Sequence, residues 1–214
     1  MQVRELLHKR SPFDKEQIEG LSLVRESWHE PHPVFEAIIS QLKPKLIIEV
    51  GTWKGDSAIH MAELCKKHRL VDTEIVCVDT WLGSAEHWEN EEWLKSLNLV
   101  GGYPSLYYQF LANVMLTENH DCITPFPIAS LHAARYLKRK NILADLVYLD
   151  ASHDYADVRA DIVSFWERLR PGGVLLGDDF HAHWHGVVRA VDEFSEEIHQ
   201  AINCAQNKWW FQKP

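Results

Sequence analysis

The chain has 214 residues, which is long enough for one α/β domain with a substantial core and short for two. Hydrophobic residues make up 46% and charged residues 25%, an ordinary balance for a soluble globular protein. The formal net charge of −9 argues against non-specific electrostatic binding to nucleic-acid phosphates, so a nucleic-acid partner is disfavoured.

The sequence gives no sign of a membrane segment or of an oxidising compartment. No apolar run approaches the roughly 20 residues needed to cross a bilayer, and residues 1–8 lack the apolar core of a signal peptide. The four cysteines are scattered without metal-site spacing: Cys65, Cys77, Cys122 and Cys204. We therefore expect reduced, structural cysteines and a cytoplasmic protein. A homo-oligomer is compatible with the sequence, but no pattern specifies one.

The first 43 residues have an amphipathic, helical pattern that is interrupted by Pro12, Pro31 and Pro33. We expect this segment to form a helical cap on a single domain that spans residues 1–214. From Lys45 onward the pattern changes to strands that alternate with helices, which is typical of a βαβ sheet.

The apolar run at residues 46–50 stops at Gly51, as a buried parallel strand would, and residues 57–67 have the pattern of its return helix. Three further segments have the pattern of buried strands: residues 74–79, 143–150 and 174–176. Apolar residues at helical spacing predict helices over residues 158–169 and 187–198.

Two segments near the C-terminus predict turns. Pro171-Gly172-Gly173 predicts a turn that leads into the strand at residues 174–176. Residues 201–213 are expected to supply a closing hairpin.

Residues 80–122 form an irregular segment between two expected strands. It is rich in aromatic residues: Trp81, Trp88, Trp93, Tyr103, Tyr107, Tyr108 and Phe110. An insertion at the end of the sheet where ligands bind commonly selects the substrate, so we predict a helical insertion on the substrate side. The alternative is that these aromatic residues simply pack a small helical subdomain.

Residues 46–57 predict a strand, a glycine loop and the start of a helix. Gly51 and Gly55 let the backbone turn tightly and approach a ligand closely, with Thr52 and Trp53 between them. Ser57 and the free N–H groups of the helix start offer donors to a carboxylate or phosphate. The loop lacks the three-glycine dinucleotide pattern and the Walker lysine, so NAD and ATP are poor fits.

Two other residues are candidates for the same pocket. Asp79 closes the second strand, where an acidic side chain can accept both hydroxyls of a ribose. Ser130 opens a helix where the edge of an adenine would lie. Each has a simpler alternative role, Asp79 as a helix or turn cap and Ser130 as an N-cap.

Acidic residues end two later strands, Asp150 after the first and Asp178-Asp179 after the second. If these strands are parallel neighbours, all three carboxylates emerge at one edge, where they repel one another strongly. A divalent cation would relieve this repulsion, and oxygen ligands favour Mg²⁺, or Mn²⁺ or Ca²⁺, over zinc. The alternative, strand-end aspartates that cap loops, explains one of the three more easily than all of them.

His153 lies three residues after Asp150 and can take up a proton at neutral pH. We predict that it removes the proton from a hydroxyl group, whereas without the aspartates it would more simply orient its loop. His181, His183 and His185 alternate as metal ligands can. We favour positions for them along the substrate side of the pocket or in solvent.

Four motifs together resemble class I S-adenosylmethionine (SAM)-dependent methyltransferases, above all the bacterial macrocin O-methyltransferase-like sugar enzymes. The motifs are LIIEVGTWKGDS at residues 46–57, VDTW at 78–81, DASHDY at 150–155 and RPGGVLLGDDF at 170–180. The similarity covers roughly residues 45–195 and also parallels the metal-dependent catechol O-methyltransferase. It implies a Rossmann-like, doubly wound α/β fold with a seven-stranded, mostly parallel sheet whose last strand is antiparallel.

The resemblance also implies roles for single residues. Glu49, Gly51 and Ser57 would hold the methionine part of SAM, and Asp79 its ribose. The full set expected to contact the cofactor is Glu49, Gly51, Thr52, Trp53, Gly55, Ser57, Asp79, Thr80, Ser130 and Asp150. The implied metal ligands are Asp150, Asp178 and Asp179, and the implied base is His153. The bulky Trp53-Lys54 pair in the glycine loop departs from the usual pattern and narrows the loop.

We therefore predict a SAM-dependent O-methyltransferase that acts on a small-molecule hydroxyl with the help of a divalent metal. A sugar or glycan acceptor rests on the resemblance alone. The alternatives are a SAM-binding regulatory or assembly protein without transferase activity, and a hydroxylase-like relative that depends on a redox metal. RNA methylation is disfavoured by the net charge.

Overall fold

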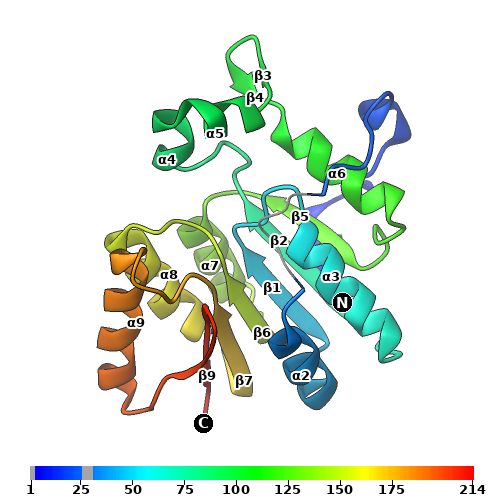
Figure 1. Ribbon diagram of the computed structural model, residues 1–214. Coiled ribbons are helices and arrows are strands. Elements are labelled where there is room, and N and C mark those ends of the chain that lie inside the picture. The colour runs from blue at the N-terminus through cyan, green and yellow to red at the C-terminus, as the bar shows by residue number, and fades with distance from the viewer. Residues whose placement is uncertain (1–2, 26–30) are drawn as a thin grey trace.

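The computed structural model describes residues 3–25 and 31–214, which fold around a seven-stranded sheet (Figure 1). The strand order is β5-β2-β1-β6-β7-β9-β8. The bounds are β1 (Leu46–Val50), β2 (Glu74–Asp79), β5 (Ile123–Pro127), β6 (Ala144–Leu149), β7 (Leu169–Gly177), β8 (Asn203–Ala205) and β9 (Lys208–Gln212). The first five strands in this order are parallel, and β9 runs antiparallel to both β7 and β8. The predicted closing hairpin is thus confirmed.

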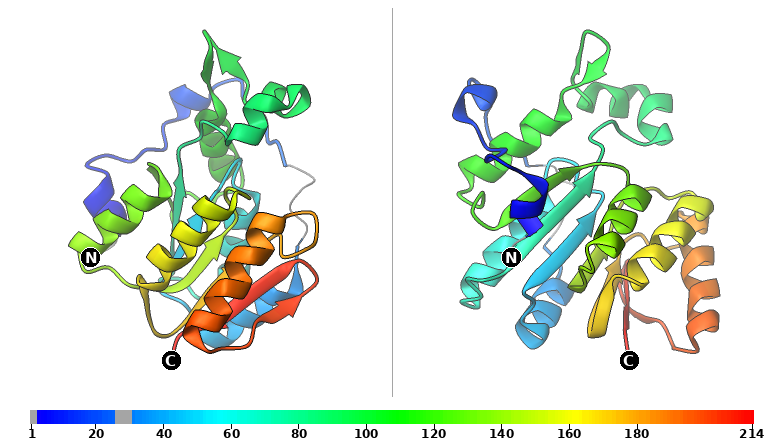
Figure 2. Two further views of the ribbon diagram at one scale, coloured as in Figure 1. Left: turned by 90° about the vertical axis from the view of Figure 1, so that its left-hand side faces the viewer. Right: turned by 180° about the vertical axis from the view of Figure 1, so that it is seen from behind.

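Helices cover both faces of the sheet because alternate residues of each central strand point to opposite faces (Figure 2). Ile47 contributes to the core under α2 (Pro33–Leu42), α3 (Asp56–Lys67) and α6 (Leu106–Leu116). Its neighbour Ile48 contributes to the core under α7 (Ser130–Arg139), α8 (Tyr155–Trp166) and α9 (His185–Ile198). This arrangement confirms the predicted doubly wound α/β fold.

The carboxyl ends of four strands meet at one edge of the sheet. The backbone N–H of Gly51 donates to Val78 at the end of β2, at 2.9 Å, and that of Asp150 donates to Val50 at the end of β1, at 2.9 Å. The N–H of Asp178 donates to Leu149 at the end of β6, at 3.1 Å. The strand order reverses between β1 and β6, and ligands of open α/β sheets bind at such a reversal.

The N-terminal segment is less helical than its sequence pattern suggests. It contains α1 (Val3–Leu7), a short 3-10 helix (Lys15–Ile18) and α2, and residues 1–2 and 26–30 of the predicted cap lie outside the described residues. The backbone N–H groups of Val3 and Arg4 donate to the carboxylate of Glu74, each at 2.7 Å. These contacts, rather than a continuous helix, attach the start of the chain to β2.

The insertion after β2 consists of α4 (Ala85–Glu89), α5 (Glu91–Ser96) and a hairpin of β3 (Leu99–Val100) and β4 (Tyr103–Pro104), followed by α6. In Figure 1 the two short helices and the hairpin project beyond the sheet. Trp81 and Phe110 are fully buried in the core, so the packing alternative holds for these two aromatic residues. Trp88 and Tyr103 are exposed.

Two predicted boundaries were wrong. The helix predicted over residues 158–169 ends at Trp166, and Leu169 already belongs to β7. Pro171-Gly172-Gly173 lies inside β7 rather than in a turn before it. The backbone there is paired, because the N–H of Gly172 donates to Lys213 and the N–H of Lys213 donates to Gly173, both at 2.8 Å.

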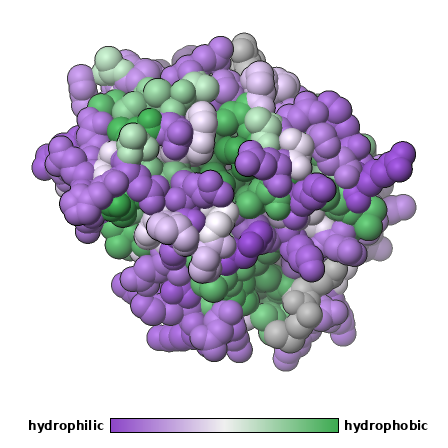
Figure 3. All heavy atoms as spheres, turned by 90° about the horizontal axis from the view of Figure 1, so that it is seen from below, coloured by the Kyte–Doolittle hydropathy of each residue, from purple (hydrophilic) through white to green (hydrophobic). Residues whose placement is uncertain are grey.

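The end of the molecule opposite the insertion carries hydrophilic residues with separate hydrophobic areas between them (Figure 3). Within residues 3–25 and 31–214, none of the helices is both long enough and apolar enough to span a membrane.

Candidate active site

The loop between β1 and α3 is shaped by two glycines in left-handed conformations. At Gly51 (φ +82°) a Cβ atom would overlap the carbonyl oxygen of Asp150, so glycine is the residue that fits. At Gly55 (φ +91°) a Cβ atom would lie 2.9 Å from the Phe110 ring. The loop therefore lies directly against the end of β6, which places the predicted cofactor loop beside the predicted acidic cluster.

Asp79 organises this loop from the end of β2. Its Oδ2 accepts the backbone N–H groups of Thr52 and Trp53, both at 2.8 Å, and its Oδ1 accepts that of Trp81 at 2.7 Å. A carboxylate has about four acceptor positions. Among the described contacts three are used, so Oδ1 can still accept one ligand hydroxyl. The neighbouring Thr80 is exposed and accepts the N–H of Leu82 at 3.2 Å, as in a turn.

Glu49 and Ser57 face each other below the loop. Glu49 is fully buried and accepts the hydroxyl of Ser57, and the thiol of Cys77 lies 3.6 Å from its Oε2. Burial raises the pKa of Glu49 to about 8, against the opposing effect of the Ser57 hydrogen bond. The pair thus links β1 to the first turn of α3, and the Ser57 hydroxyl is directed at Glu49.

The structure shows where the side chain of Trp53 lies and which position Ser130 has in its helix. The ring of Trp53 packs against His87 of α4 with ring centres 4.5 Å apart, and its carbonyl accepts the Trp81 indole N–H at 2.7 Å. The bulky side chain therefore contacts the insertion. Ser130 is the first residue of α7, whose N-cap is Ala129, so the N-cap role for Ser130 was wrong.

Asp150 and Asp178 lie close together, as the parallel strands predict. The Tyr148 hydroxyl is 2.9 Å from Asp150 Oδ2 and 3.0 Å from Asp178 Oδ2, and it has one proton to donate. Burial raises the pKa of Asp150 to about 7, and the negative charges of Asp178 and Asp179 add to this effect. The cluster is therefore a site of strong mutual repulsion.

Asp178 is surrounded by donors on both oxygens. The ammonium of Lys208 forms an ion pair with Oδ2, which also faces Tyr148. Oδ1 accepts the side-chain amide of Asn207 at 2.6 Å and the backbone N–H of Asp179 at 2.7 Å. Lys208, Asn207 and the N–H of Asp179 are thus committed to this carboxylate, and Tyr148 shares its one proton between Asp178 and Asp150, so little acceptor capacity remains.

This arrangement does not fit the predicted metal ion. A metal ligand needs a free lone pair, and those of Asp178 face three committed protein donors and the shared hydroxyl of Tyr148. The carboxylate of Asp179 points to His153 instead, at 3.0 Å. Across the part of the chain that the structure describes, no group of three or more His, Cys, Asp or Glu side chains is arranged to hold a metal ion.

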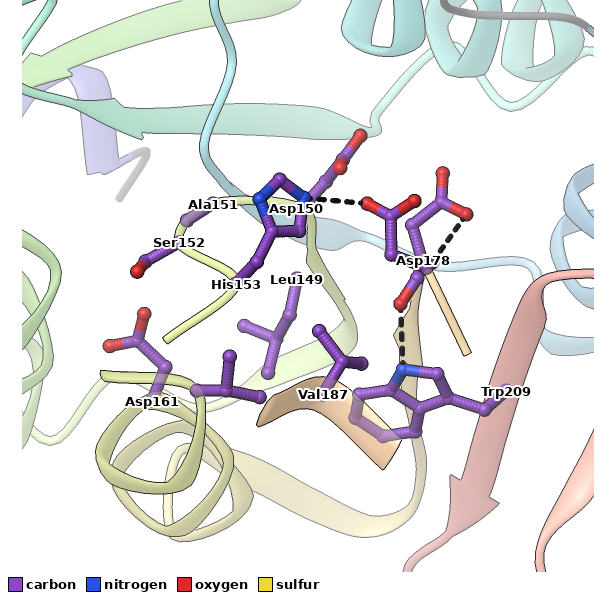
Figure 4. Close-up of a pocket in the computed structure, with 11 residues that line it drawn as sticks. Leu149, Asp150, Ala151, Ser152, His153, Asp161, Asp178, Val187 and Trp209 are labelled. Carbon is purple, nitrogen blue, oxygen red and sulfur yellow. Dashed lines mark hydrogen bonds and ion pairs between the residues drawn. The ribbon is translucent and has the colours of Figure 1, made fainter. Parts of the chain in front are cut away.

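His153 lies between two carboxylates from different parts of the chain, Asp179 and Glu86. Figure 4 shows its ring at the pocket beside Asp150 and Asp178. Its Nε2 is 3.0 Å from Asp179 Oδ2, its Nδ1 is 2.9 Å from Glu86 Oε2, and its ring stacks on Trp184 with centres 3.7 Å apart. Burial acts to lower the pKa of His153, but the hydrogen bonds and charges of Asp179 and Glu86 outweigh it and raise the pKa to about 9. His153 thus holds its proton tightly while both carboxylates are in place.

Sequence reasoning missed five residues of this site: Glu86, Tyr148, Trp184, Asn207 and Lys208. Tyr148 had a usable signal, because it is two residues before Asp150 and so shares its side of the strand. Lys208 precedes Trp-Trp-Phe, an unusual setting for a lysine. Glu86 is 67 residues from His153 and had no sequence signal. His181, His183 and His185 are exposed, which agrees with either predicted position, along the substrate side of the pocket or in solvent.

The chain belongs to the methyltransferase domain family, whose sequence profile matches residues 48–180. The uncharacterized protein y4gI of Sinorhizobium fredii (strain NBRC 101917 / NGR234) is 28% identical to it over 164 residues. That match covers 75% of this chain and 16% of y4gI, so the chain spans a small part of this relative.

Several solved methyltransferases share the fold. The O-methyltransferase of Bacillus cereus, solved in complex with SAH, has 15% identity and a TM-score of 0.61 over 97% of this chain and 94% of its own. TomG of Streptomyces achromogenes, in complex with SAM, has 13% identity and a TM-score of 0.61 over all of both chains. CalS11, a TDP-rhamnose 3'-O-methyltransferase of calicheamicin biosynthesis, has 17% identity and a TM-score of 0.59 over 84% of this chain and 77% of its own. The predicted methyltransferase fold is confirmed.

Proposed function

We propose that this methyltransferase transfers a methyl group from SAM to a hydroxyl of a small molecule, with a sugar or glycan as the acceptor class. The main support for the proposal is that the glycine loop and His153 lie at the same edge of the sheet. The glycine loop lies against Asp150, and His153 follows Asp150 by three residues. A cofactor held by the loop and an acceptor held by His153 would therefore meet at the end of β1 and β6. The SAM and SAH complexes of structural neighbours and the sugar substrate of CalS11 support this choice.

The residues of the loop are suited to SAM. The N-cap of α3 is Gly55, which has no side chain to cap the helix, so the N–H groups of Ser57 and Ala58 in its first turn can bind the carboxylate of a ligand. The open position of Asp79 Oδ1 suits a ribose hydroxyl. When bound, SAM supplies a methyl carbon whose bond to a positively charged sulfur breaks as the acceptor oxygen attacks, with the bonding electrons passing to sulfur.

His153 receives the proton of the acceptor hydroxyl at one ring nitrogen in this proposal, after the hydroxyl has displaced the carboxylate of Glu86 or Asp179 from that nitrogen. To do so its imidazole must first be neutral, and the raised pKa makes that form a minority at neutral pH. Activity should therefore rise with pH toward about 9. The Mg²⁺ (or Mn²⁺ or Ca²⁺) that the sequence predicted at Asp150, Asp178 and Asp179 does not fit the donors around Asp178, and no step here depends on it.

The insertion supplies the acceptor side of the site in this proposal, within a single domain of residues 1–214. Glu86 of α4 reaches His153, and His87 packs on Trp53. The exposed rings of Trp88 and Tyr103 offer flat apolar faces on which a sugar ring can pack.

Transfer of an isotope-labelled methyl group from SAM to a panel of free sugars, nucleotide-linked sugars and catechols tests the proposal. His153→Ala should lower turnover by about 10²–10⁴-fold while SAH affinity is retained, because only the base is lost. His199→Asn is the matched control, since His199 is exposed at the far end of α9 and has the left-handed backbone that asparagine tolerates.

Each other outcome selects an alternative. Tight SAM binding without transfer to any acceptor would favour the regulatory or assembly protein. Turnover that requires a redox metal would favour the hydroxylase-like relative. Full activity of His153→Ala would remove His153 from the base role.

A further inference from the structure

The acidic cluster carries a counter-charge built into the chain. We infer that the ammonium of Lys208 supplies the positive charge that a divalent metal ion would otherwise supply at this cluster, so that the site works without a metal ion. This inference rests on the proposed function, because it describes how the same site tolerates its carboxylates. It departs from the metal set predicted by the sequence, Asp150, Asp178 and Asp179.

The fold places Lys208 at the cluster. Strand β9 pairs antiparallel with β7, and Trp209 lies opposite Gly177. The residue before Trp209 therefore lies beside the residue after Gly177, which is Asp178. A backbone hydrogen bond of 2.8 Å from the N–H of Phe180 to the carbonyl of Asn207 fixes the hairpin at this point. The ion pair thus follows from strand register.

The ammonium is held at the site by its surroundings. The Lys208 side chain is 6% exposed, and that of its partner Asp178 is 12% exposed. The Nζ atom also lies 5.8 Å from the centres of the Phe35 and Tyr148 rings, whose faces attract a cation. A lysine is rarely buried this deeply unless its charge is paired, so the pair with Asp178 is a fixed feature of the site.

The same contacts block a second cation. An oxygen that binds a metal ion must present a lone pair to it, and Lys208 and Tyr148 already approach Oδ2 of Asp178. A metal ion at Oδ2 would also sit next to a buried ammonium, and the two positive charges would repel each other strongly in this poorly solvated position. The positive charge at this edge therefore comes from the chain.

Manganese binding tests the inference without knowledge of the acceptor. The full-length protein is freed of metals with EDTA and titrated with Mn²⁺, whose free ion is counted by electron paramagnetic resonance. We expect the wild type to leave Mn²⁺ free and to bind SAH equally well in EDTA and in Mg²⁺, as measured by calorimetry. Methyl transfer, where an acceptor is found, should be unchanged by EDTA.

Lys208→Met should reverse this behaviour. The variant keeps most of the length of the side chain but leaves Asp178 without its ammonium. It should bind Mn²⁺ about 100-fold more tightly than the wild type, because a buried carboxylate that has lost its cationic partner attracts another cation. A lysine whose role is only to hold the hairpin would not produce this gain. Lys213→Met is the matched control, since Lys213 follows the same strand but donates to the carbonyls of Trp166 and Leu169 rather than to a carboxylate.

Stoichiometric Mn²⁺ binding by the wild type, or loss of SAH binding or transfer in EDTA with recovery in Mg²⁺, would overturn the inference. Absence of the Mn²⁺ gain in a folded Lys208→Met variant would overturn it as well. If Lys208→Met does not fold, the wild-type titration still decides the question. A wild type that neither binds SAH nor transfers methyl groups would instead count against the proposed function.

Discussion

The two halves of the candidate site are built differently. The cofactor half comes from one continuous segment, Gly51 to Ser57, tied to Asp79 on the neighbouring strand. The half that holds Asp150 and Asp178 needs partners from three other parts of the chain: the insertion, the loop before α9 and the β8–β9 hairpin. The cofactor half can therefore be recognised as a motif in the sequence, whereas the residues of the acidic half come together only in the folded chain.

The two halves also differ in what stabilises them. Asp79 is satisfied by backbone N–H groups, whose positions the loop itself fixes. Asp178 and His153 are satisfied by charged side chains that other elements bring to them. A substitution in the first half should therefore act mainly on backbone geometry and stability, and one in the second half mainly on charge and turnover.

The largest stability effect in the cofactor half is expected at Gly51. Gly51→Ala would force a Cβ atom onto the carbonyl oxygen of Asp150 and leave alanine in a left-handed conformation. We expect a loss of at least about 3 kcal/mol in the free energy of unfolding, from backbone strain plus displacement of the loop. Gly20→Ala is the control, since Gly20 has a similar φ of +79° with nothing within 4 Å. Denaturant unfolding of both variants checks the difference, and equal losses would show that the close approach to Asp150 is unimportant.

A smaller effect, on turnover alone, is expected at Glu86. Glu86→Gln replaces the carboxylate that faces Nδ1 of His153, while Asp179 still holds Nε2. Turnover at pH 9 should fall by about tenfold, because an orienting carboxylate is lost but the second remains. The rise of activity with pH should begin at a lower pH than in the wild type, because Glu86 helps to raise the pKa of His153. SAH affinity should not change. Glu89→Gln, an exposed residue of the same short helix, serves as the control. Unchanged turnover in Glu86→Gln would show that the insertion does not contribute to methyl transfer through Glu86.

The smallest effect concerns pH and Glu49. Burial raises the pKa of Glu49 to about 8 in the folded protein, above its ordinary value of 4.5. Its contribution to stability is therefore complete below the unfolded pKa and is lost as pH rises through about 8. Glu49→Gln removes this titration, so its melting temperature should fall less than that of the wild type between pH 6 and pH 9.

Each kcal/mol of that difference corresponds to roughly 2–4 °C in a chain of this size. The exposed Glu196→Gln on α9 is the control and should follow the wild type. Parallel melting curves for wild type and Glu49→Gln across this pH range would mean that Glu49 is not protonated in the fold.

The sequence predicted most of the fold because its strands are short apolar runs with clear ends. The strands at residues 46–50 and 74–79 agree with β1 and β2 to the residue. The start of β7 was missed, since Pro171-Gly172-Gly173 has the composition of a turn but pairs with the C-terminal strand. Local composition could not reveal that partner.

The site was predictable only where the sheet itself brings residues together. Asp150 and Asp178 meet because their strands are parallel neighbours. The partners of the acidic cluster were not predictable, since Lys208 and Glu86 reach it through tertiary contacts at separations of 30 and 67 residues. This is why the sequence suggested a metal ion where the structure has an ammonium.

Calorimetric titration of SAH into the wild-type protein is the most direct test of the claim that a SAM site and His153 share one edge of the sheet. We expect one SAH-binding site, kept in His153→Ala and lost or greatly weakened in Gly51→Ala, with no heat from NAD. Absence of SAH binding, or SAH binding that Gly51→Ala leaves intact, would contradict it.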